Sequence, residues 1–485
     1  MTRAMRFCSS IALLCLAVGA FAQVATVDAD KAIVLAGIDD IHPRMLNVNQ
    51  AIWSYAEPGL EEVRSSKELM DWLAENGFSV QTGVAGMPTA FVASYGKGEP
   101  VIAYLAEYDA LIGVSQKAIP HREERDDPLI IAGHGCGHSV FGTGTTAAAI
   151  ALAQVMALKK LPGTVRLYGT PAEETVDAKT FMLRDGLFDD VDVVLAWHAS
   201  DRTGASYRYS KAVLGARFAF EGVPAHASAS PQFGRSALDA IELMNVGVNY
   251  LREHVPQDTR IHYVVTDGGG QPNVVPPKAA SWYYVRADRH DTVEQVYARI
   301  VDVARGAALM TGTTLNYVVD GDAHEVLPNR ALSHIINDNL RMVGPPQFDD
   351  QDRAFARETQ KDLTSIADRA LFEGIAPVPE LPAQGMASTD QGDLSWHVPT
   401  GGLTVASYAF GAPGHSWQVA ASTGMSIGEK AMTVAAKTLA ATGFDLLTQP
   451  SLLEQARESF REIRDPLEFH SLLPEDAHAP AAIRE

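Results

Sequence analysis

The stretch GHGCGHSVFGTGTTAAAIALAQVMALKK, residues 133–160, joins a glycine-rich turn to a long apolar segment. The turn carries His134, Cys136 and His138, and imidazole and thiolate are preferred ligands of borderline divalent metals. The interleaved glycines allow the backbone to curl tightly, so that these side chains can converge. The alanine-rich segment 140–160 predicts a long helix beside the turn. A turn with incidental histidines is the weaker alternative, because three ligand-type residues occur within five positions.

Short apolar runs on both sides of this stretch predict strands that alternate with helices. The runs are 91–95, 101–105, 165–168 and 191–197. Residues 31–77 have a helical pattern, whereas the polar, proline-containing segment 114–132 predicts an irregular loop. The alternation indicates an α/β domain whose site lies at the strand ends.

The region 214–320 has a different order of predicted strands and helices, which indicates a second domain. Strands are predicted at 216–220, 261–266, 280–287 and 313–319, and helices at 236–254 and 292–310. The order β-α-β-β-α-β is that of a ferredoxin-like domain. A helix near 331–342, strand candidates before and after Pro399, and a helix beyond Thr448 follow it. We therefore predict an α/β domain into which a ferredoxin-like α+β domain is inserted, as a chain of 485 residues allows.

The N-terminal residues are typical of an export signal. Arg3 and Arg6 precede the short apolar core 11–18, and Ala20-Phe21-Ala22 is a small-x-small cleavage site. A buried N-terminal helix is the alternative. The apolar core is too short to cross a bilayer, and no later stretch approaches ~20 uninterrupted apolar residues. We expect a secreted or periplasmic protein.

The predicted boundaries follow from these segments. They are 1–22 for the signal peptide, 23–212 and 325–447 for the two parts of the α/β domain, 213–324 for the inserted domain, and 448–485 for a C-terminal helix and tail.

Removal of residues 1–22 would leave a strongly acidic chain with a single cysteine. Without Arg3 and Arg6, 37 basic and 59 acidic residues remain, a net charge of −22. Such a surface repels nucleic acid and anionic lipid, so neither nucleic acid nor a membrane is an expected partner of the cleaved chain. Cys136 would be the only thiol, which excludes an intrachain disulfide. Metal ligation would account for a lone thiol in an oxidising compartment.

Three further segments place ligand-type residues at or near the ends of predicted elements. Glu173 and Glu174 follow one strand, His198 follows another, and His415 lies in the tight turn 411–416. Two adjacent carboxylates can divide the work, one binding metal and the other acting as general base. Taken singly, each segment also has an ordinary interpretation, as an acidic loop or a structural histidine.

Seven short motifs follow one another along the chain. They are Glu107-Tyr-Asp109, Gly135-Cys136-Gly-His138, Pro-Ala-Glu173-Glu174, Trp197-His198, His226-Ala, Asn273-Val-Val-Pro and Gly414-His415-Ser. In this order they resemble the aminoacylase/carboxypeptidase family of metallohydrolases, from about residue 30 to past residue 440. The Cys-Gly-His form resembles the amidohydrolase branch, which includes aminobenzoyl-glutamate and indole-acetyl-amino-acid hydrolases.

The resemblance implies a metallohydrolase catalytic domain with an inserted lid and dimerisation domain, and a role for each motif. Glu173 would be the general base. Asp109 would orient a metal-binding residue without binding the metal itself. His226 would stabilise the oxyanion, usually from the partner subunit, and Asn273 would help to hold the substrate carboxylate. Cys136 would replace the histidine that other branches carry at Glu107. The implied ligands of two divalent metals, manganese or zinc, are Cys136, His138, Glu174, His198 and His415.

The implied activity is hydrolysis of the amide bond in N-acyl or aryl-acyl amino acids, such as aminobenzoyl-glutamate-like compounds. A dipeptidase or carboxypeptidase using the same site is the alternative. A non-catalytic, metal-stabilised binding protein is a remote one, because it predicts a lost base or lost ligands. We expect a homodimer formed through the inserted domain, or an assembly with a second, non-identical subunit.

Overall fold

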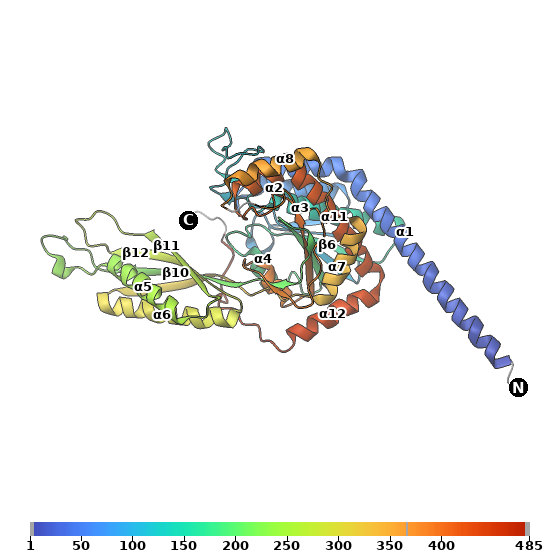
Figure 1. Cartoon of the computed structure of the whole chain (residues 1–485). Coiled ribbons are helices and arrows are strands. Elements are labelled where there is room, and N and C mark those ends of the chain that lie inside the picture. Colours follow the sequence, from blue (N-terminus) through green and yellow to red (C-terminus); the bar gives the residue numbers. More distant parts are fainter. Residues whose placement is uncertain (1–3, 365–366, 481–485) are drawn as a thin grey trace.

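The computed structural model describes residues 4–364 and 367–480. They form two lobes side by side, each built on its own sheet, and helix α1 (Ala4–Tyr55) projects beyond the larger lobe (Figure 1). A mixed seven-stranded sheet forms the centre of the larger lobe, and an antiparallel four-stranded sheet that of the smaller one. The predicted α/β fold with a separate α+β domain is confirmed. Of the predicted signal peptide, residues 1–3 lie outside the described residues.

The sheet of the larger lobe has a parallel centre. Its strands, in spatial order, are β1 (Ser79–Thr82), β2 (Phe91–Lys97), β6 (Gly163–Gly169), β3 (Val101–Ala106), β7 (Val193–Ser200), β15 (Thr400–Ala406) and β8 (Gly204–Ala205). The strands β6, β3, β7 and β15 are parallel, whereas β1, β2 and β8 are antiparallel to their neighbours. The carboxyl ends of the four parallel strands therefore meet at one edge, where ligands bind in open α/β sheets.

Helix α3 (His138–Lys159) forms the centre of the helical layer on this sheet. It packs on β3, β6 and β7 and contacts α1 and α11 (Ser426–Thr448) on other sides. Its small alanine side chains are buried nearly all round, as in a core helix. Within the described chain, α3 is the one helix long and apolar enough to cross a membrane. However, 89% of its most apolar stretch is buried inside the protein.

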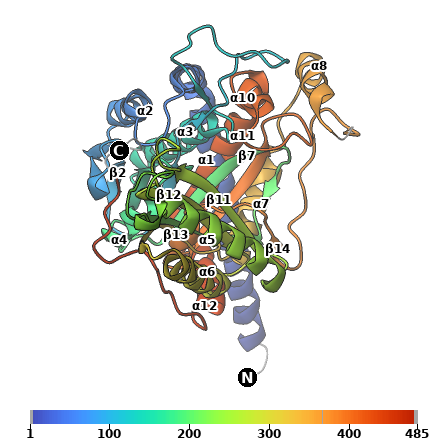
Figure 2. The ribbon, with the colours of Figure 1, turned by 90° about the vertical axis from the view of Figure 1, so that its left-hand side faces the viewer.

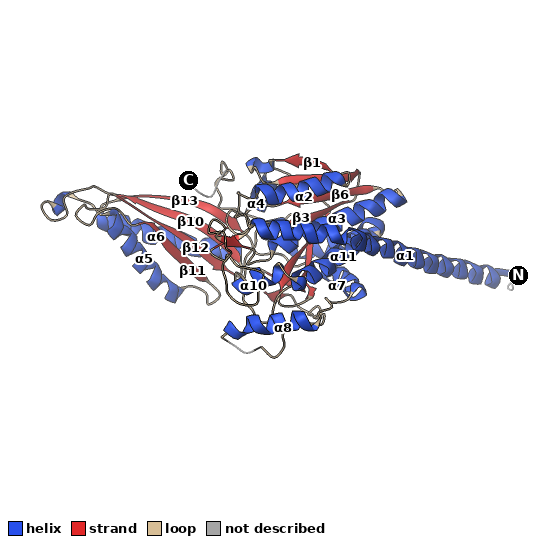
Figure 3. Ribbon diagram, turned by 90° about the horizontal axis from the view of Figure 1, so that it is seen from above, coloured by secondary structure: helices blue, strands red, loops and turns tan. Residues whose placement is uncertain are grey.

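The smaller lobe is a four-stranded antiparallel sheet with two helices along it (Figure 2, Figure 3). In chain order its elements are β10 (Ala212–Glu221), α5 (Ala237–Leu251), β11 (Arg260–Asp267), β12 (Lys278–Ala287), α6 (His290–Thr311) and β13 (Thr314–Ala323). The strands lie in the order β11-β12-β10-β13, with α5 packed on β12 and α6 on β10. The predicted ferredoxin-like order of elements is confirmed.

The helical pattern predicted over 31–77 is wrong in its middle. Helix α1 ends and α2 (Val63–Glu75) begins after a turn in which Ala56 and Leu60 have φ angles of 45° and 61°. Pro58 in this turn has no N–H group with which to continue a helix. The turn therefore separates two helices that share one polarity pattern.

The other predicted elements agree with the structure within a few residues, except that the strand predicted before Pro399 is wrong, because residues 391–395 form a short helix there. The helices predicted near 331–342 and beyond residue 448 correspond to α7 (Arg330–Val343) and α12 (Pro450–Arg464). Strand β7 extends to Ser200 rather than residue 197, because β15 pairs with it that far. The remaining short elements are β4 (Leu111–Ile112), β5 (Ala132–Gly133), α4 (Ala178–Arg184), β9 (Arg208–Tyr209), α8 (Asp350–Thr359), β14 (Ala383–Gln384), α9 (Gln391–Ser395) and α10 (Trp417–Thr423).

Gly142 lets α3 approach the residues that follow β3. A Cβ atom at this position would lie 2.5 Å from the carbonyl oxygen of Glu107. We expect Gly142→Ala to lower the free energy of unfolding by about 1–3 kcal/mol, as overpacking of a core does. Gly306→Ala in α6 is the matched control, because nothing lies within 4 Å of its Cβ position. Equal stability of the two variants in urea denaturation would contradict the close approach.

Candidate active site

The five predicted metal ligands lie together near the carboxyl ends of the parallel strands. They come from the turn before α3, the start of α3, the loop after β6, strand β7 and the turn before α10. Their ligand atoms form two groups of three, each within 4.8 Å: Cys136 with His138 and His198, and Cys136 with Glu174 and His415. The Cys136 thiol belongs to both groups. It therefore lies between two adjacent positions that can each hold a cation.

Two backbone features bring the ligand turns together. Gly137, in the first turn, has a φ of 87°, and a Cβ atom there would lie 2.6 Å from the Cβ of Ala199. Only glycine fits such a position without strain. The N–H group of His415 donates a hydrogen bond to the carbonyl oxygen of Gly135 at 2.9 Å. His415 itself has a φ of 58°, a costly conformation of the kind found at functional sites.

Asp109 contacts two of the ligand residues at once. Its Oδ1 lies 2.7 Å from Nδ1 of His138, and its Oδ2 accepts a hydrogen bond from the N–H group of Glu174 at 3.1 Å. Burial disfavours the charged form, but His138 holds the pKa of Asp109 below its usual value. The His138 ring consequently presents Nε2 to the other ligand groups, which is the geometry that an orienting residue provides.

His198 is oriented by a backbone carbonyl group. Its Nδ1 lies 2.7 Å from the carbonyl oxygen of Ala199, and its Nε2 lies 3.3 Å from Sγ of Cys136. Burial lowers the pKa of His198 to about 4, so the ring is neutral at physiological pH, as metal ligation requires. Burial also raises the pKa of the Cys136 thiol, so a thiolate at this position needs a cation beside it.

Two buried polar atoms of the cluster have no hydrogen-bond partner among the described residues. They are Nε2 of His138 and Oε1 of Glu174, which lie 3.9 Å apart, although Nε2 of His138 also lies 3.2 Å from Oε2 of Glu107. A buried polar atom without a partner is costly, and most such atoms in native proteins are satisfied. Divalent cations with nitrogen, sulfur and oxygen ligands would satisfy both atoms. The residues present therefore fit metal ions.

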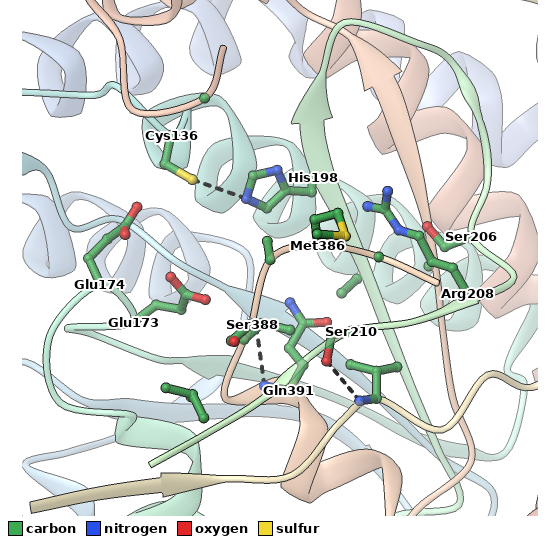
Figure 4. A pocket seen from close by; sticks show the side chains of 18 of the residues that line it. Cys136, Glu173, Glu174, His198, Ser206, Arg208, Ser210, Met386, Ser388 and Gln391 are labelled. Atoms are coloured by element: carbon green, nitrogen blue, oxygen red, sulfur yellow. Dashed lines mark hydrogen bonds between the residues drawn. The ribbon is translucent and has the colours of Figure 1, made fainter. Parts of the chain in front are cut away.

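Glu173 lies beside the ligand groups and points its carboxylate into the cavity (Figure 4). Its carboxylate lies within 4.8 Å of ligand atoms of Glu107 and His138. Burial, together with the negative charges of Glu107 and Glu174, raises the pKa of Glu173 well above its usual value. A carboxylate with a raised pKa accepts a proton more readily, as a general base must.

Three candidate residues do not join the cluster. His226 and Asn273 lie together on the smaller lobe, where the N–H group of Ala227 donates to the carbonyl oxygen of Asn273 at 3.0 Å. Neither residue lines the cavity, so their predicted roles require a second chain or a movement of the lobe. His134 is buried outside both ligand groups, with Nε2 3.0 Å from the carbonyl oxygen of Ile52.

The lysine that balances the buried carboxylates was not predicted from the sequence. Lys179 on α4 is fully buried, and its Nζ lies 2.8 Å from Oε1 of Glu107 and 2.7 Å from Oδ1 of Asp390. Gln391 donates a further hydrogen bond to the same oxygen of Glu107 at 3.2 Å. Glu107 is therefore held by protein groups on one oxygen. The lysine at the start of the segment AKTFMLR, 178–184, was the only signal in the sequence.

The ligand groups open into a cavity of about 710 Å³ to which both lobes contribute. A volume in this range accommodates a small organic molecule. In Figure 4, Cys136, Glu173 and Glu174 lie at one end of the view and Arg208 at the other, with His198 between them. Other residues that line the cavity are Trp282, Tyr284, Arg286, Met386 and Ser388.

Residues 103–443 match peptidase family M20/M25/M40. One of the subunits of the p-aminobenzoyl-glutamate hydrolase of Escherichia coli (strain K12) is 38% identical over 458 residues, which cover 89% of this chain and 95% of that protein. The Xaa-Arg dipeptidase of Mus musculus is 28% identical, over 87% of this chain and 90% of that protein.

Two solved structures share the fold. The aminobenzoyl-glutamate utilization protein from Klebsiella pneumoniae superposes with a TM-score of 0.56 and 21% identity, over 84% of this chain and 97% of that one. The Bacillus subtilis YXEP protein, described as a dinuclear metal-binding peptidase from the M20 family, has a TM-score of 0.55 and 20% identity, over 84% and 99%.

Together with the family match, the fold and the cluster of ligand residues define a hydrolase of C–N bonds of the amidohydrolase and peptidase class. The chain belongs to peptidase family M20/M25/M40, and the resemblance inferred from its seven motifs is confirmed.

We expect Lys179→Met to destabilise the protein by about 3–5 kcal/mol, because it leaves Glu107 and Asp390 buried without their cation. Lys67→Met is the matched control, since Lys67 pairs with Asp71 on the exposed surface of α2 and should cost less than about 0.5 kcal/mol. Denaturant unfolding of both variants measures the difference. If Lys179→Met lowers the free energy of unfolding no more than the control does, Lys179 is not needed to neutralise Glu107 and Asp390.

Proposed function

We propose that the chain is a metal-dependent amidohydrolase that cleaves N-acyl or aryl-acyl amino acids, such as aminobenzoyl-glutamate-like compounds. The observation that carries this proposal is the pair of ligand groups that share Cys136, with the Glu173 carboxylate beside them. The 38% identity to one chain of a p-aminobenzoyl-glutamate hydrolase, over 95% of that protein, supports the substrate class.

In this proposal the five ligands hold two divalent cations, manganese or zinc. When bound, the cations supply Lewis acidity to the amide carbonyl group and to the attacking water. Glu173 takes a proton from that water and passes it to the leaving nitrogen. His226 stabilises the charge that develops on the carbonyl oxygen, and Asn273 binds the substrate carboxylate. Asp109 keeps His138 turned toward the site.

Substitution of the two adjacent carboxylates separates base from ligand. We expect Glu173→Gln to lower kcat by about 10²–10⁴-fold with metal content unchanged, because only the proton transfer is lost. We expect Glu174→Gln to lower metal content as well, because it removes a ligand. Elemental analysis and steady-state kinetics on aminobenzoyl-glutamate measure both effects. Near-normal turnover by Glu173→Gln would rule out its role as base.

A dipeptidase using the same site is the second candidate. It is favoured by the 28% identity to the Xaa-Arg dipeptidase of Mus musculus over 90% of that protein. The two candidates differ in the shape of the substrate rather than in the chemistry, so comparative hydrolysis of N-acyl amino acids and dipeptides distinguishes them. A non-catalytic binding protein is the least supported candidate, because the base and all five ligand residues are present.

We also propose that two chains associate through the smaller lobe. Strand β11 is an edge strand, and unpaired edges invite pairing with another chain. Large apolar side chains are exposed along β11 and on α5, the helix of the same side of the lobe. They are Leu243, Val246, Tyr250, Val264 and Val265. A twofold dimer through this surface buries them and brings each lobe near the other chain.

A non-identical partner is the alternative to a homodimer. The similar hydrolase of Escherichia coli has two different subunits, and the second of them is 28% identical to this chain over 288 residues. Two related chains can present similar surfaces to each other, so the same lobe could contact either kind of partner. Native mass spectrometry of the purified chain distinguishes a homodimer from a chain that lacks its partner.

Mixing of two inactive variants tests whether the two chains of a dimer share sites. We expect His226→Ala and Glu173→Gln to be inactive alone. If His226 acts across a twofold dimer, random re-association should restore about one quarter of the sites. Activity after mild dissociation and mixing, with each variant carried through alone as control, measures this. No recovery, despite mixed dimers detected by native mass spectrometry, would show that His226 does not act across the interface.

For localisation, we propose that the N-terminal segment directs export and that the protein acts in the periplasm or outside the cell. The support is the order of two arginines, an apolar core at 11–18 and the small-x-small site at 20–22. A lone metal-ligating thiol is compatible with that oxidising environment.

A further inference from the structure

Arg208 lines the cavity with a guanidinium group that has no partner in the described part of the chain. It begins the short strand β9, which β14 holds in place by parallel pairing. Other arginines near it are paired: Arg286 donates to Oγ of Ser388 at 2.9 Å, and Arg289 lies 3.1 Å from Glu325. Arg208 thus offers unused hydrogen-bond donors to whatever occupies the cavity.

The surroundings of Arg208 favour an anion from outside the chain. In Figure 4, Arg208 and Ser206 lie at the end of the view opposite Glu173 and Glu174. Burial by neighbouring atoms lowers the pKa of Arg208, although the residue as a whole is exposed. A guanidinium group without a partner can bind a charged acceptor through charge-assisted hydrogen bonds.

The other charged groups of the cavity set a requirement on an acidic substrate. Glu173, Glu174, Asp177 and Asp320 line the same space, where carboxylates disfavour a second negative charge, although Asp320 pairs with Arg217 at 2.6 Å. Arg286 is a second arginine on the cavity wall. In the proposed function Asn273 binds one carboxylate, the α-carboxylate that every N-acyl amino acid carries. A substrate with an additional carboxylate needs a cation on the wall of the larger lobe.

We propose that Arg208 binds the side-chain carboxylate of an acidic amino acid in the substrate and thereby selects N-acyl glutamate or aspartate over neutral analogues. This inference rests on the function proposed above. The planar guanidinium group can bind a carboxylate through two parallel hydrogen bonds, which a lysine cannot reproduce. Arg208 is then a specificity-determining residue that takes no part in bond cleavage.

Arg208→Met tests this proposal, because it keeps the length of the side chain and removes the charge. Steady-state kinetics compare aminobenzoyl-glutamate, aminobenzoyl-glutamine and aminobenzoyl-alanine. We expect kcat/KM for the glutamate compound to fall about 10- to 100-fold, through KM, because a charge-assisted hydrogen bond is lost. The values for the other two compounds should change less than about threefold. Arg208→Glu should instead favour aminobenzoyl-lysine.

Arg202→Met is the matched control, because Arg202 is exposed like Arg208 but pairs with Asp201 and does not line the cavity. Its substrate preference should equal that of the unmodified protein. An equal loss on all three compounds, or an unchanged preference in Arg208→Met, would overturn the assignment.

Calorimetric binding of free glutamate and alanine to the metal-loaded protein separates this inference from the proposed function. If no aminobenzoyl compound is hydrolysed, the proposed function fails. The assignment of Arg208 then stands only if glutamate binds more tightly than alanine and Arg208→Met abolishes that difference. Equal binding of the two amino acids by the unmodified protein overturns it.

Discussion

The two hydrogen bonds of the Asp109 carboxylate are the constraint on which the active site depends. One oxygen orients His138 at the start of α3, and the other holds the backbone at Glu174 after β6. Asp109 itself follows β3, which lies beside β6 in the sheet. One buried carboxylate therefore couples a helix and two strands, so the packing of α3 on the sheet also sets the distance between two ligand residues.

The site also depends on which cation neutralises each of its buried negative groups. Several carboxylates and the Cys136 thiol lie close together, and like charges at such distances cannot all ionise unless cations lie between them. Lys179 provides the positive charge for Glu107 and Asp390. The thiol and the carboxylate of Glu174 are left to face metal ions. The protein thus uses its own lysine on one side of the cluster and leaves the other side for cations from solution.

The ligand set and most of the fold could be predicted because their signals are local. Glycine spacing at 133–138 and adjacent carboxylates at 173–174 can be recognised in short segments, and apolar periodicity predicted the two sheets. The helix break after α1 was missed because the polarity pattern continues through the turn at Pro58. Lys179 was missed because its partners lie 72 residues before it and 211 residues after it, and nothing in the segment 178–184 identifies them.

The sequence by itself determined the chemistry that is available: which side chains can bind metal, which carboxylate stands next to a ligand, and which segments form helices and strands. Only the tertiary structure decided which of these groups lie close enough to hold the same cation and which side chains line the cavity. Cys136 belongs to both ligand groups, a position between two cation sites that the order of the motifs does not reveal. Likewise, Arg208 became a candidate only through its place on the cavity wall. The physical reason is that distance, burial and the pairing of charges depend on contacts between distant segments, which local residue patterns do not contain.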